Sequence, residues 1–565
     1  RLEVAGDVDE FRLAGRAGQE WVVFAQGRGA ELQLVDSATA QVVRALTVHG
    51  ASAELEEWST GRVVLPRTGS YLVRVTHAAF GSAPNSYRLR VDAVNRAPES
   101  GTASLALGAV AGDALEGVGD IDEYTFTGQA GREMNLMVQL ESGVSAGLIV
   151  ELLLAEAPVA NVRASVVTAT LDENGTGRIA LPADGTYRVR VSGPAAGKRA
   201  TATGRYRIEL YPVDRRPEAG GPLALDAAPL SSAIDRPGDV DEFRFQGTAG
   251  QYAVLAFSGV GTTRGDLMAE LVNAQGITIV ATATRDVYSA PVGYSRRAQL
   301  PSTGTYTVRV TGRTGDASNL ASGAYSLEAY TVSAAPEHIS ATLQIGETAS
   351  GEAMDRPGDL DVFTFTGEAG RVVNFFLGEP SPSGLIARVR AEGSSEFLGM
   401  ATRSGPLSLD GLSTGRVTLE GKRYTLSVEH ESVPAAPIGA GTYALRIFPI
   451  DRRPEGRSAT YTLGETVATE PLAPAGDIDE YTLTVATSTR LAIVWDAPQG
   501  NPSVAVFGIL YDANGMERWN SWVTHNFELV REITLAAGSY RLRIENPNRG
   551  GDMPSLPYRF SFTPR

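Results

Sequence analysis

Short runs of alternating polar and apolar residues recur along the whole chain. Tyr187–Val191 reads Tyr-Arg-Val-Arg-Val, and Thr307–Thr311 and Arg541–Ile544 show the same alternation. A period of two is typical of strands that bury one face. Glycine-rich turns separate the runs, and no segment sustains the 3.6-residue period of a capped amphipathic helix. The pattern therefore predicts an all-β protein.

Three motifs recur in phase and divide the chain into copies of one unit. An acidic motif, Gly-Asp-x-Asp followed in four copies by Glu and then an aromatic residue, begins at Gly6, Gly119, Gly238, Gly358 and Gly476. A tyrosine motif such as Gly185-Thr-Tyr follows each one. A Pro-Glu dipeptide marks each junction between two units, which we call a seam, at Pro98, Pro217, Pro336 and Pro454. Repeats in phase are the signature of tandem modules. The predicted units are residues 1–97, 98–216, 217–335, 336–453 and 454–565.

Each unit predicts an antiparallel β-sandwich of jelly-roll-like type, because it holds several short strands and many turns. The seams are short and contain proline, so we expect stiff linkers and an elongated rod. Five sandwiches would span on the order of 150–200 Å. The seam arginines Arg215, Arg216, Arg452 and Arg453 either pair with acids of the neighbouring unit or remain solvated.

The first unit is shorter than the others. The motif aspartate follows the seam proline by 22 or 23 residues in units two to five, whereas only six residues precede Asp7. A first strand like Ser104–Leu107 or Leu223–Leu225 is therefore absent from unit one. Three interpretations are open: the chain continues a longer protein, a protease has trimmed it, or a strand of another molecule completes the sheet.

Composition excludes several function classes. The net charge of −15 disfavours nucleic acid and anionic membranes as partners, and no apolar run is long enough to insert in a membrane. The chain has no cysteine, which excludes disulfides, thiolate metal sites and cysteine nucleophiles. Gly143–Gly147 and Gly411–Gly415 match Gly-x-Ser-x-Gly, but a nucleophile elbow needs a helix after the serine. We therefore expect a protein that is not an enzyme.

The acidic motif, the turns such as Gly128-Gln-Ala-Gly131 and the Gly-Ser/Thr-Tyr motif together resemble the bacterial pre-peptidase C-terminal (PPC) domain family. The resemblance covers the whole chain as five tandem copies. Unit four departs from it at Lys422-Arg-Tyr, and unit five at Val485-Ala-Thr-Ser. Membership implies an extracellular, usually non-catalytic β-sandwich module. Some members bind calcium near the acidic motif, and some bind polymers such as collagen.

The acidic motif is the best candidate site. Alternate residues of a strand share a face, so Asp-x-Asp brings two carboxylates together, and calcium prefers such oxygen ligands. Three units carry a further acid four residues before the first aspartate. The predicted ligands are Glu116, Asp120 and Asp122; Asp235, Asp239 and Asp241; and Asp355, Asp359 and Asp361. The alternative is structural: the first aspartate caps a turn and the second packs against a neighbouring arginine.

Two tryptophans form a second candidate site. Trp519 and Trp522 lie in a segment that only unit five contains, and an exposed aromatic pair would suit a partner or a sugar ring. The alternative is packing at a sheet edge. Trp21 and Trp495 lie in apolar runs, and we expect both in the core.

The sequence favours a non-catalytic, secreted or cell-surface structural protein, such as a stalk, fibre subunit or adhesive scaffold, since every residue belongs to the repeat. Its partners would be further copies of itself or an extracellular polymer. The alternative is a substrate-binding accessory array of a larger secreted protease or other exoenzyme, which would gain by avidity. A spacer of tandem units that calcium stiffens is compatible with both of these functions.

Overall fold

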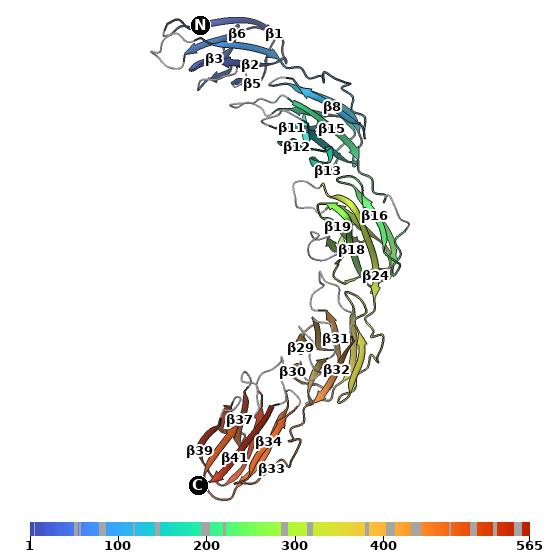
Figure 1. The fold of residues 1–565 in the computed structure, drawn as a ribbon, viewed down its shortest axis with the longest axis vertical. Coiled ribbons are helices and arrows are strands. Elements are labelled where there is room, and N and C mark those ends of the chain that lie inside the picture. Colours follow the sequence, from blue (N-terminus) through green and yellow to red (C-terminus); the bar gives the residue numbers. More distant parts are fainter. Residues whose placement is uncertain are drawn as a thin grey trace.

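The structure is a computed structural model in which β-domains follow one another along an open arc, with the two termini at opposite ends (Figure 1). It describes residues 1–4, 6–49, 55, 58–77, 86–116, 119–141, 147–193, 204–217, 222–283, 292–312, 320–378, 384–402, 413–430, 442–473, 476–497, 505–523, 528–546 and 556–565. We name the domains 1 to 5 by the predicted ranges. No helix among the described residues is long and apolar enough to cross a membrane.

Domains 1 and 2 show the basic arrangement. Domain 1 contains β1 (Asp9–Gly15), β2 (Glu20–Gln26), β3 (Ala30–Asp36), β4 (Val42–Thr47), β5 (Ser59–Val64), β6 (Gly69–His77) and β7 (Arg88–Ala93). Domain 2 contains β8 (Val110–Leu115), β9 (Ile121–Gly128), β10 (Glu133–Leu140), β11 (Leu148–Leu154), β12 (Ala157–Ala164), the 3-10 turn η2 (Leu171–Glu173), β13 (Gly175–Ala180), β14 (Gly185–Ser192) and β15 (Gly204–Pro212).

Domains 3 and 4 repeat the same order of strands. Domain 3 contains β16 (Leu230–Ile234), β17 (Val240–Gly247), β18 (Tyr252–Arg264), β19 (Leu267–Val272), β20 (Thr278–Ala283), β21 (Gly293–Tyr294), β22 (Ala298–Gln299), β23 (Gly304–Gly312) and β24 (Ser322–Val332). Domain 4 contains β25 (Thr348–Ala353), β26 (Leu360–Thr366), β27 (Val372–Gly378), β28 (Leu385–Ala391), β29 (Gly399–Thr402), β30 (Ser413–Thr418), β31 (Arg423–His430) and β32 (Thr442–Pro449).

Domain 5 adds one short strand. It contains β33 (Thr460–Tyr461), β34 (Thr466–Leu472), β35 (Ile478–Val485), β36 (Thr489–Asp496), β37 (Val506–Asp512), β38 (Glu517–Val523), β39 (Leu529–Leu535), β40 (Gly538–Glu545) and β41 (Leu556–Pro564). β33 pairs with β35 in parallel, so the predicted antiparallel sandwich has a local exception. Elsewhere the named strands pair antiparallel, for example β9 with β14.

Every domain consists of two sheets, and the strands that the domains share follow one order. In domain 2 the sheets run β9-β14-β11-β12 and β8-β15-β10-β13. Apolar residues from both sheets meet in one buried cluster per domain, such as Phe126 of β9 and Leu136 of β10. The tyrosine motif closes a corner of each sandwich: the Tyr187 hydroxyl donates to the Ala183 carbonyl at 2.7 Å. The predicted fold class, tandem β-sandwich domains, is confirmed.

Among the described residues of domain 1, no named strand corresponds to β8. Among the described strands, β7 pairs only with β2, whereas β15 pairs with both β10 and β8. Phe11 in domain 1 is 46% exposed, whereas Tyr124 at the same place in domain 2 is 2% exposed. This agrees with the shorter first repeat.

We predict faster amide exchange in β7 than in β15, because only one edge of β7 is paired. Protection of an edge amide requires a partner carbonyl, so exchange should be faster by at least about tenfold. Hydrogen exchange with mass spectrometry measures the difference. β6 and β14, which are central in their sheets, serve as the control pair and should exchange alike.

The seams are held by arginine. Arg215 forms ion pairs with Glu133 of domain 2 and Glu242 of domain 3, at 2.6 and 2.5 Å. Arg452 likewise pairs with Glu480 at 2.9 Å. Arg216, in contrast, is 92% exposed at its side chain. One arginine of the first dipeptide therefore binds across the seam, and the other faces solvent.

Candidate functional site: acidic clusters at the seams

The first aspartate of the acidic motif caps a turn. The Oδ2 atom of Asp359 accepts a hydrogen bond from the backbone amide of Asp355 at 3.0 Å, and Oδ1 accepts one from Leu360 at 2.8 Å. Asp120 accepts the equivalent pair of bonds in domain 2, and Asp7 does so in domain 1. This is the capping geometry that the structural interpretation predicted.

The second aspartate binds a tyrosine in every domain, and in domains 2 to 5 it is fully buried. In domain 2 the Tyr206 hydroxyl donates to Oδ2 of Asp122 at 2.6 Å, and Tyr558 does the same to Asp479 of domain 5 at 2.5 Å. The same pair is formed by Asp9 and Tyr87, Asp241 and Tyr325, and Asp361 and Tyr443. The expected arginine partner of this aspartate is therefore wrong. A neutral tyrosine satisfies one oxygen and leaves the charge uncompensated.

The seam glutamate brings a third carboxylate to the motif. In domains 2, 4 and 5, one oxygen from each of three acids lies within 4.8 Å of the others. We call these groups the acidic clusters. They are Glu99, Asp113 and Asp122 in domain 2; Glu337, Asp359 and Asp361 in domain 4; and Glu455, Asp477 and Asp479 in domain 5. In domains 4 and 5 the two motif aspartates meet as the alternation of a strand predicts.

The acids four residues before the motif do not join the clusters. The side chains of Glu116, Asp235 and Asp355 are exposed. In domains 2 and 4 only the backbone amide of this residue takes part: Glu116 donates to Asp120, and Asp355 donates to Asp359. In domain 3 the predicted ligands Asp239 and Asp241 are buried, but the seam residue Glu218 lies outside the described residues.

Burial raises the pKa of the second aspartate. Loss of hydration is the largest cause; it raises the pKa of Asp122 to about 7 and that of Asp361 to about 8, against the tyrosine bond that lowers both. Neighbouring carboxylates raise them further. The pKa of Asp479 rises to about 7 for the same reasons. Burial therefore shifts these aspartates toward the protonated form when no cation is bound.

The same aspartates hold unused oxygen atoms. Among the described residues, Oδ1 of Asp122, Oδ1 of Asp361 and Oδ1 of Asp479 are buried and accept no hydrogen bond. Each of the three aspartates is fully buried. A buried carboxylate oxygen without a donor is costly unless a cation binds it. The clusters therefore fit a hard divalent cation, which takes carboxylate and carbonyl oxygens.

Sequence reasoning missed the buried acids of the first strand. Asp113 on β8 accepts bonds from the amide and hydroxyl of Ser100, and Glu352 on β25 accepts bonds from the amides of His338 and Ile339. These acids fix the seam backbone next to the clusters. The Pro-Glu dipeptide, repeated at every seam, was the signal that could have revealed the third ligand.

The two tryptophans separate in space. Trp519 packs edge to face against Trp495 and Phe562, at 6.4 and 6.2 Å between ring centres. Trp522, three residues further along β38, is 58% exposed. Trp21 and Trp495 are buried, as expected. Of the two Gly-x-Ser-x-Gly matches, Gly143–Gly147 lies mostly outside the described residues, and Gly411–Gly415 partly so.

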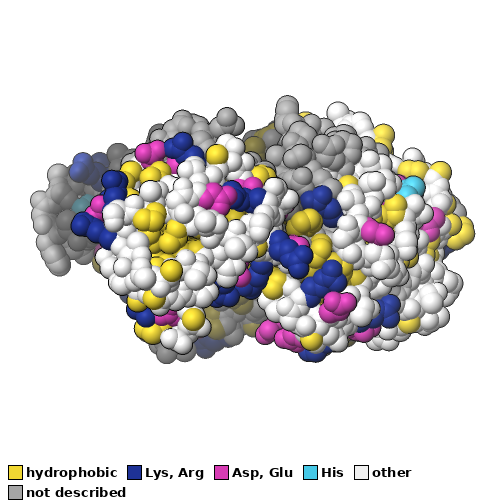
Figure 2. Space-filling view, turned by 90° about the horizontal axis from the view of Figure 1, so that it is seen from below, with side chains coloured by type: hydrophobic (Ala, Val, Ile, Leu, Met, Phe, Trp, Pro, Cys, Tyr) yellow, Lys and Arg dark blue, Asp and Glu magenta, His cyan; other side chains and the backbone are white. Residues whose placement is uncertain are grey.

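Charges of both signs lie on the face of the molecule that Figure 2 shows. On that face, basic and acidic side chains lie beside one another and alternate with hydrophobic side chains. Ion pairs also occur within single domains, such as that of Arg190 with Glu123 at 2.7 Å in domain 2.

Comparison with known proteins gives limited similarity. No family model and no curated protein matches the chain. The pre-peptidase C-terminal domain of collagenase from Bacillus anthracis is 18% identical, covering 20% of this chain and 99% of that one, with a TM-score of 0.16. The CUB1-EGF-CUB2 region of human MASP-1/3 is 9% identical over 38% of this chain and 99% of that one (TM-score 0.14). Tripeptidyl peptidase 2 is 10% identical over 79% and 34% (TM-score 0.15). At these TM-scores the similarities carry no argument about function.

Proposed function

We propose that the chain is a non-catalytic structural protein of the cell exterior, a stalk or fibre subunit of five PPC-like domains whose acidic clusters bind calcium. The carrying observation is the position of the clusters. Each includes the glutamate of a seam together with the motif aspartate of the following sandwich, for example Glu455 with Asp477 and Asp479. A cation there would tie the linker to the domain that follows it.

Calcium is the cation that suits this donor set best. The ligands are carboxylates alone, and the chain offers no cysteine to a softer metal. Three carboxylates leave room in the six to eight positions of calcium for backbone carbonyls and water. The unused oxygens of Asp361 and Asp479 would provide direct contacts.

Electron microscopy of the purified chain, with calcium and with a chelator, tests the structural role. We expect curved rods on the order of 150–200 Å long, or fibres built from them. Hydrolase activity of the purified chain, or compact particles in both buffers, would contradict the proposal. Isothermal titration with calcium tests the clusters separately, using the D361N D479N variant as the matched control.

A second function is favoured by an exposed aromatic side chain in domain 5. Trp522 on β38 is 58% exposed. An exposed tryptophan suits an accessory array that binds an extracellular polymer. Sedimentation with fibrillar collagen would measure this: binding that W522A abolishes supports the array, and no binding leaves the structural role as the function.

A further inference from the structure

The glycine of the acidic motif is a contact between domains. A Cβ atom built on Gly358 of domain 4 would lie 2.7 Å from the side chain of Val254 in domain 3. At Gly476 the same atom would lie 2.5 Å from Asn374 of domain 4. The other two seams repeat this contact, between Gly119 and Val22 and between Gly238 and Asn135. Every motif glycine that follows a domain therefore packs against that domain.

The four partner residues occupy one position of the fold. Val22, Asn135, Val254 and Asn374 lie on β2, β10, β18 and β27, the corresponding strand of each domain. Their side chains point away from their own core, yet all four are at most 1% exposed. The motif glycine of the next domain and side chains of their own sheet, such as Tyr330 beside Val254 and Tyr211 beside Asn135, cover them.

An arginine beside this position holds the incoming turn. Arg416, which pairs in register with Asn374, donates from Nε to the Gly476 carbonyl at 2.5 Å and from Nη2 to the Asp477 carbonyl at 2.9 Å. Its Nη1 atom forms an ion pair with Glu545 of domain 5 at 2.6 Å.

The preceding seam repeats this arrangement. Arg297 of domain 3 donates to the carbonyls of Gly358 and Asp359 at 2.8 and 3.1 Å, and pairs with Glu429 of domain 4. Two seams thus use the same three-point contact. Arg62 and Arg178 occupy the equivalent register positions in domains 1 and 2, opposite Val22 and Asn135.

Domain 5 supplies an internal comparison. The register that pairs Asn374 with Arg416 pairs Ala492 with Glu532 in domain 5. Glu532 forms an ion pair with Arg490 of its own sheet. Arginine therefore stands at this position in domains 1 to 4, whose contact with a following repeat the structure shows, and an acid stands there in domain 5. The sandwich of domain 5 forms without this arginine. The arginine therefore correlates with the contact between domains and not with the fold of a single domain.

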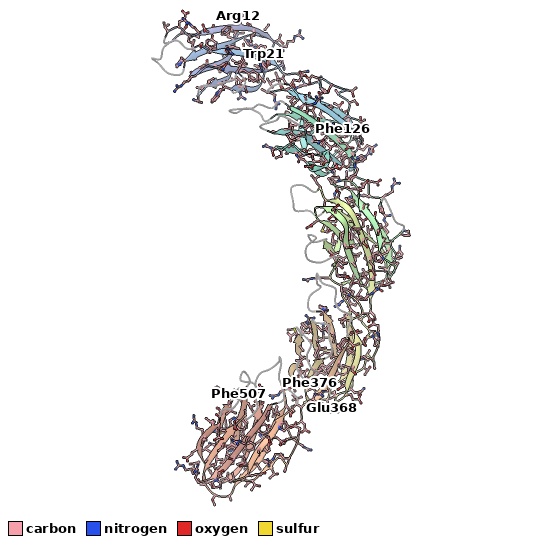
Figure 3. All side chains as sticks on the ribbon, in the orientation of Figure 1. Arg12, Trp21, Phe126, Glu368, Phe376 and Phe507 are labelled. Carbon is pink, nitrogen blue, oxygen red and sulfur yellow. The ribbon has the colours of Figure 1, made fainter. Side chains whose placement is uncertain are left out.

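We propose that the four seams are one repeated plug-and-socket interface, and that its partner is another domain of the same type. The plug is the motif glycine with its own carbonyl and that of the following aspartate; the socket is the valine or asparagine with its arginine. Apolar contacts extend it, since Phe376 of domain 4 joins the buried cluster of domain 5 (Figure 3). Domains joined by a small polar contact move freely, whereas this interface fixes the angle between neighbours and makes the arc of Figure 1 one body.

Two glycine variants test the interface. Gly6 and Gly358 have the same left-handed backbone, with φ of +84° and +85°, but a Cβ at Gly6 meets nothing within 4 Å. G6A and G358A therefore carry the same local backbone penalty, and only G358A pushes against a neighbouring domain. The chain has no native cysteine, so spin labels at Q246C and T366C report the distance between domains 3 and 4 alone.

Double electron–electron resonance in a calcium chelator measures the distance between the two labels. We expect one narrow distance distribution in the parent chain and in G6A, and a broad distribution in G358A and in R297A. E532A is the control for removing a charge at the socket position of domain 5, and should leave the distribution narrow. V254A should narrow the distribution of G358A again. A broad distribution in the parent, or narrow ones in both G358A and R297A, would overturn the proposal. If G358A unfolds domain 4, R297A decides.

Discussion

In a calcium chelator, the melting temperatures of domains 2, 4 and 5 will fall as the pH rises from about 5 to about 8.5. The pKa values of Asp122, Asp361 and Asp479 are raised to about 7, 8 and 7 in the folded chain, against 3.8 for the free side chain. A raised folded pKa gives a stabilisation that is complete below the unfolded pKa and is lost as the pH passes the folded pKa. Each pKa unit corresponds to about 1.4 kcal/mol.

The expected fall is on the order of 10 °C per domain, because 1 kcal/mol shifts the melting temperature of a domain this size by about 4–8 °C. Differential scanning calorimetry at several pH values measures it. Calcium should remove the pH dependence, since a bound cation replaces the proton. D361N should remove the pH dependence from domain 4 alone. D355N, which changes an exposed acid, should leave the pH dependence of domain 4 in place. Melting temperatures that change neither with pH nor with calcium would disprove the role of the acidic clusters.

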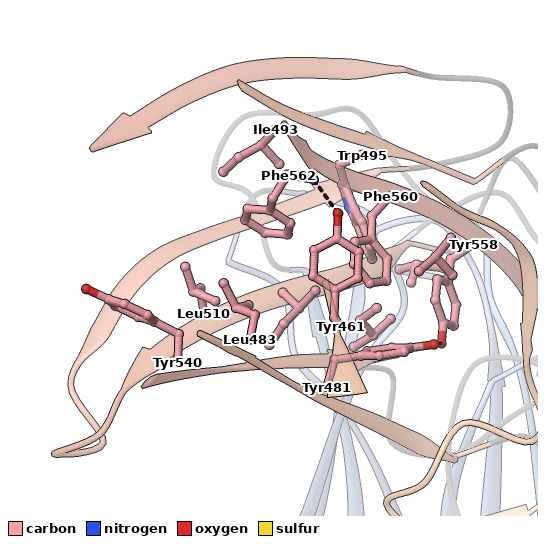
Figure 4. Packing of buried hydrophobic residues seen from close by; sticks show 14 of the residues in the cluster. Tyr461, Tyr481, Leu483, Ile493, Trp495, Leu510, Tyr540, Tyr558, Phe560 and Phe562 are labelled. Carbon is pink, nitrogen blue, oxygen red and sulfur yellow. Dashed lines mark hydrogen bonds between the residues drawn. The ribbon is translucent and has the colours of Figure 1, made fainter. Parts of the chain in front are cut away.

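The largest effect of a single substitution is expected from Trp495→Ala, which should destabilise domain 5 by about 3–5 kcal/mol. Trp495 is fully buried and packs against Trp519, Tyr558 and Phe560, with ring centres 6.4, 6.1 and 6.3 Å away. Figure 4 shows it within the aromatic cluster, beside the bond from the Phe562 amide to Tyr461. Truncation would leave a cavity that the surrounding strands cannot close.

Each domain has its own buried cluster, and Phe376 is the residue of domain 4 in that of domain 5, so most of the effect should stay within domain 5. Calorimetry should show one early transition and four unchanged ones. W522A on β38 is the matched control: it removes the same side chain at an exposed position and should change stability by less than about 0.5 kcal/mol. Equal losses from both variants, or a loss shared by all domains, would contradict separate cores.

The candidate site could be predicted in part. The meeting of Asp359 with Asp361, and of Asp477 with Asp479, follows from the alternation of a strand, which is local. The acid four residues earlier, such as Asp355, was a natural third ligand in sequence, but its side chain faces solvent because its amide binds Asp359. The third oxygen comes from Glu337, which only the folded seam brings to the motif.

The sequence by itself determined the repeats, the strands and their sandwich class, because alternation and turn composition are local and recur five times. The tertiary structure decided which distant groups meet. Tyr558 reaches Asp479 across 79 residues, and Arg416 reaches the carbonyl of Gly476 across 60. Such pairs depend on sheet register and on the angle between domains, which side-chain packing sets and which no local pattern encodes. The glycine of the acidic motif shows the difference: the sequence predicted its turn, but not its contact with the preceding domain.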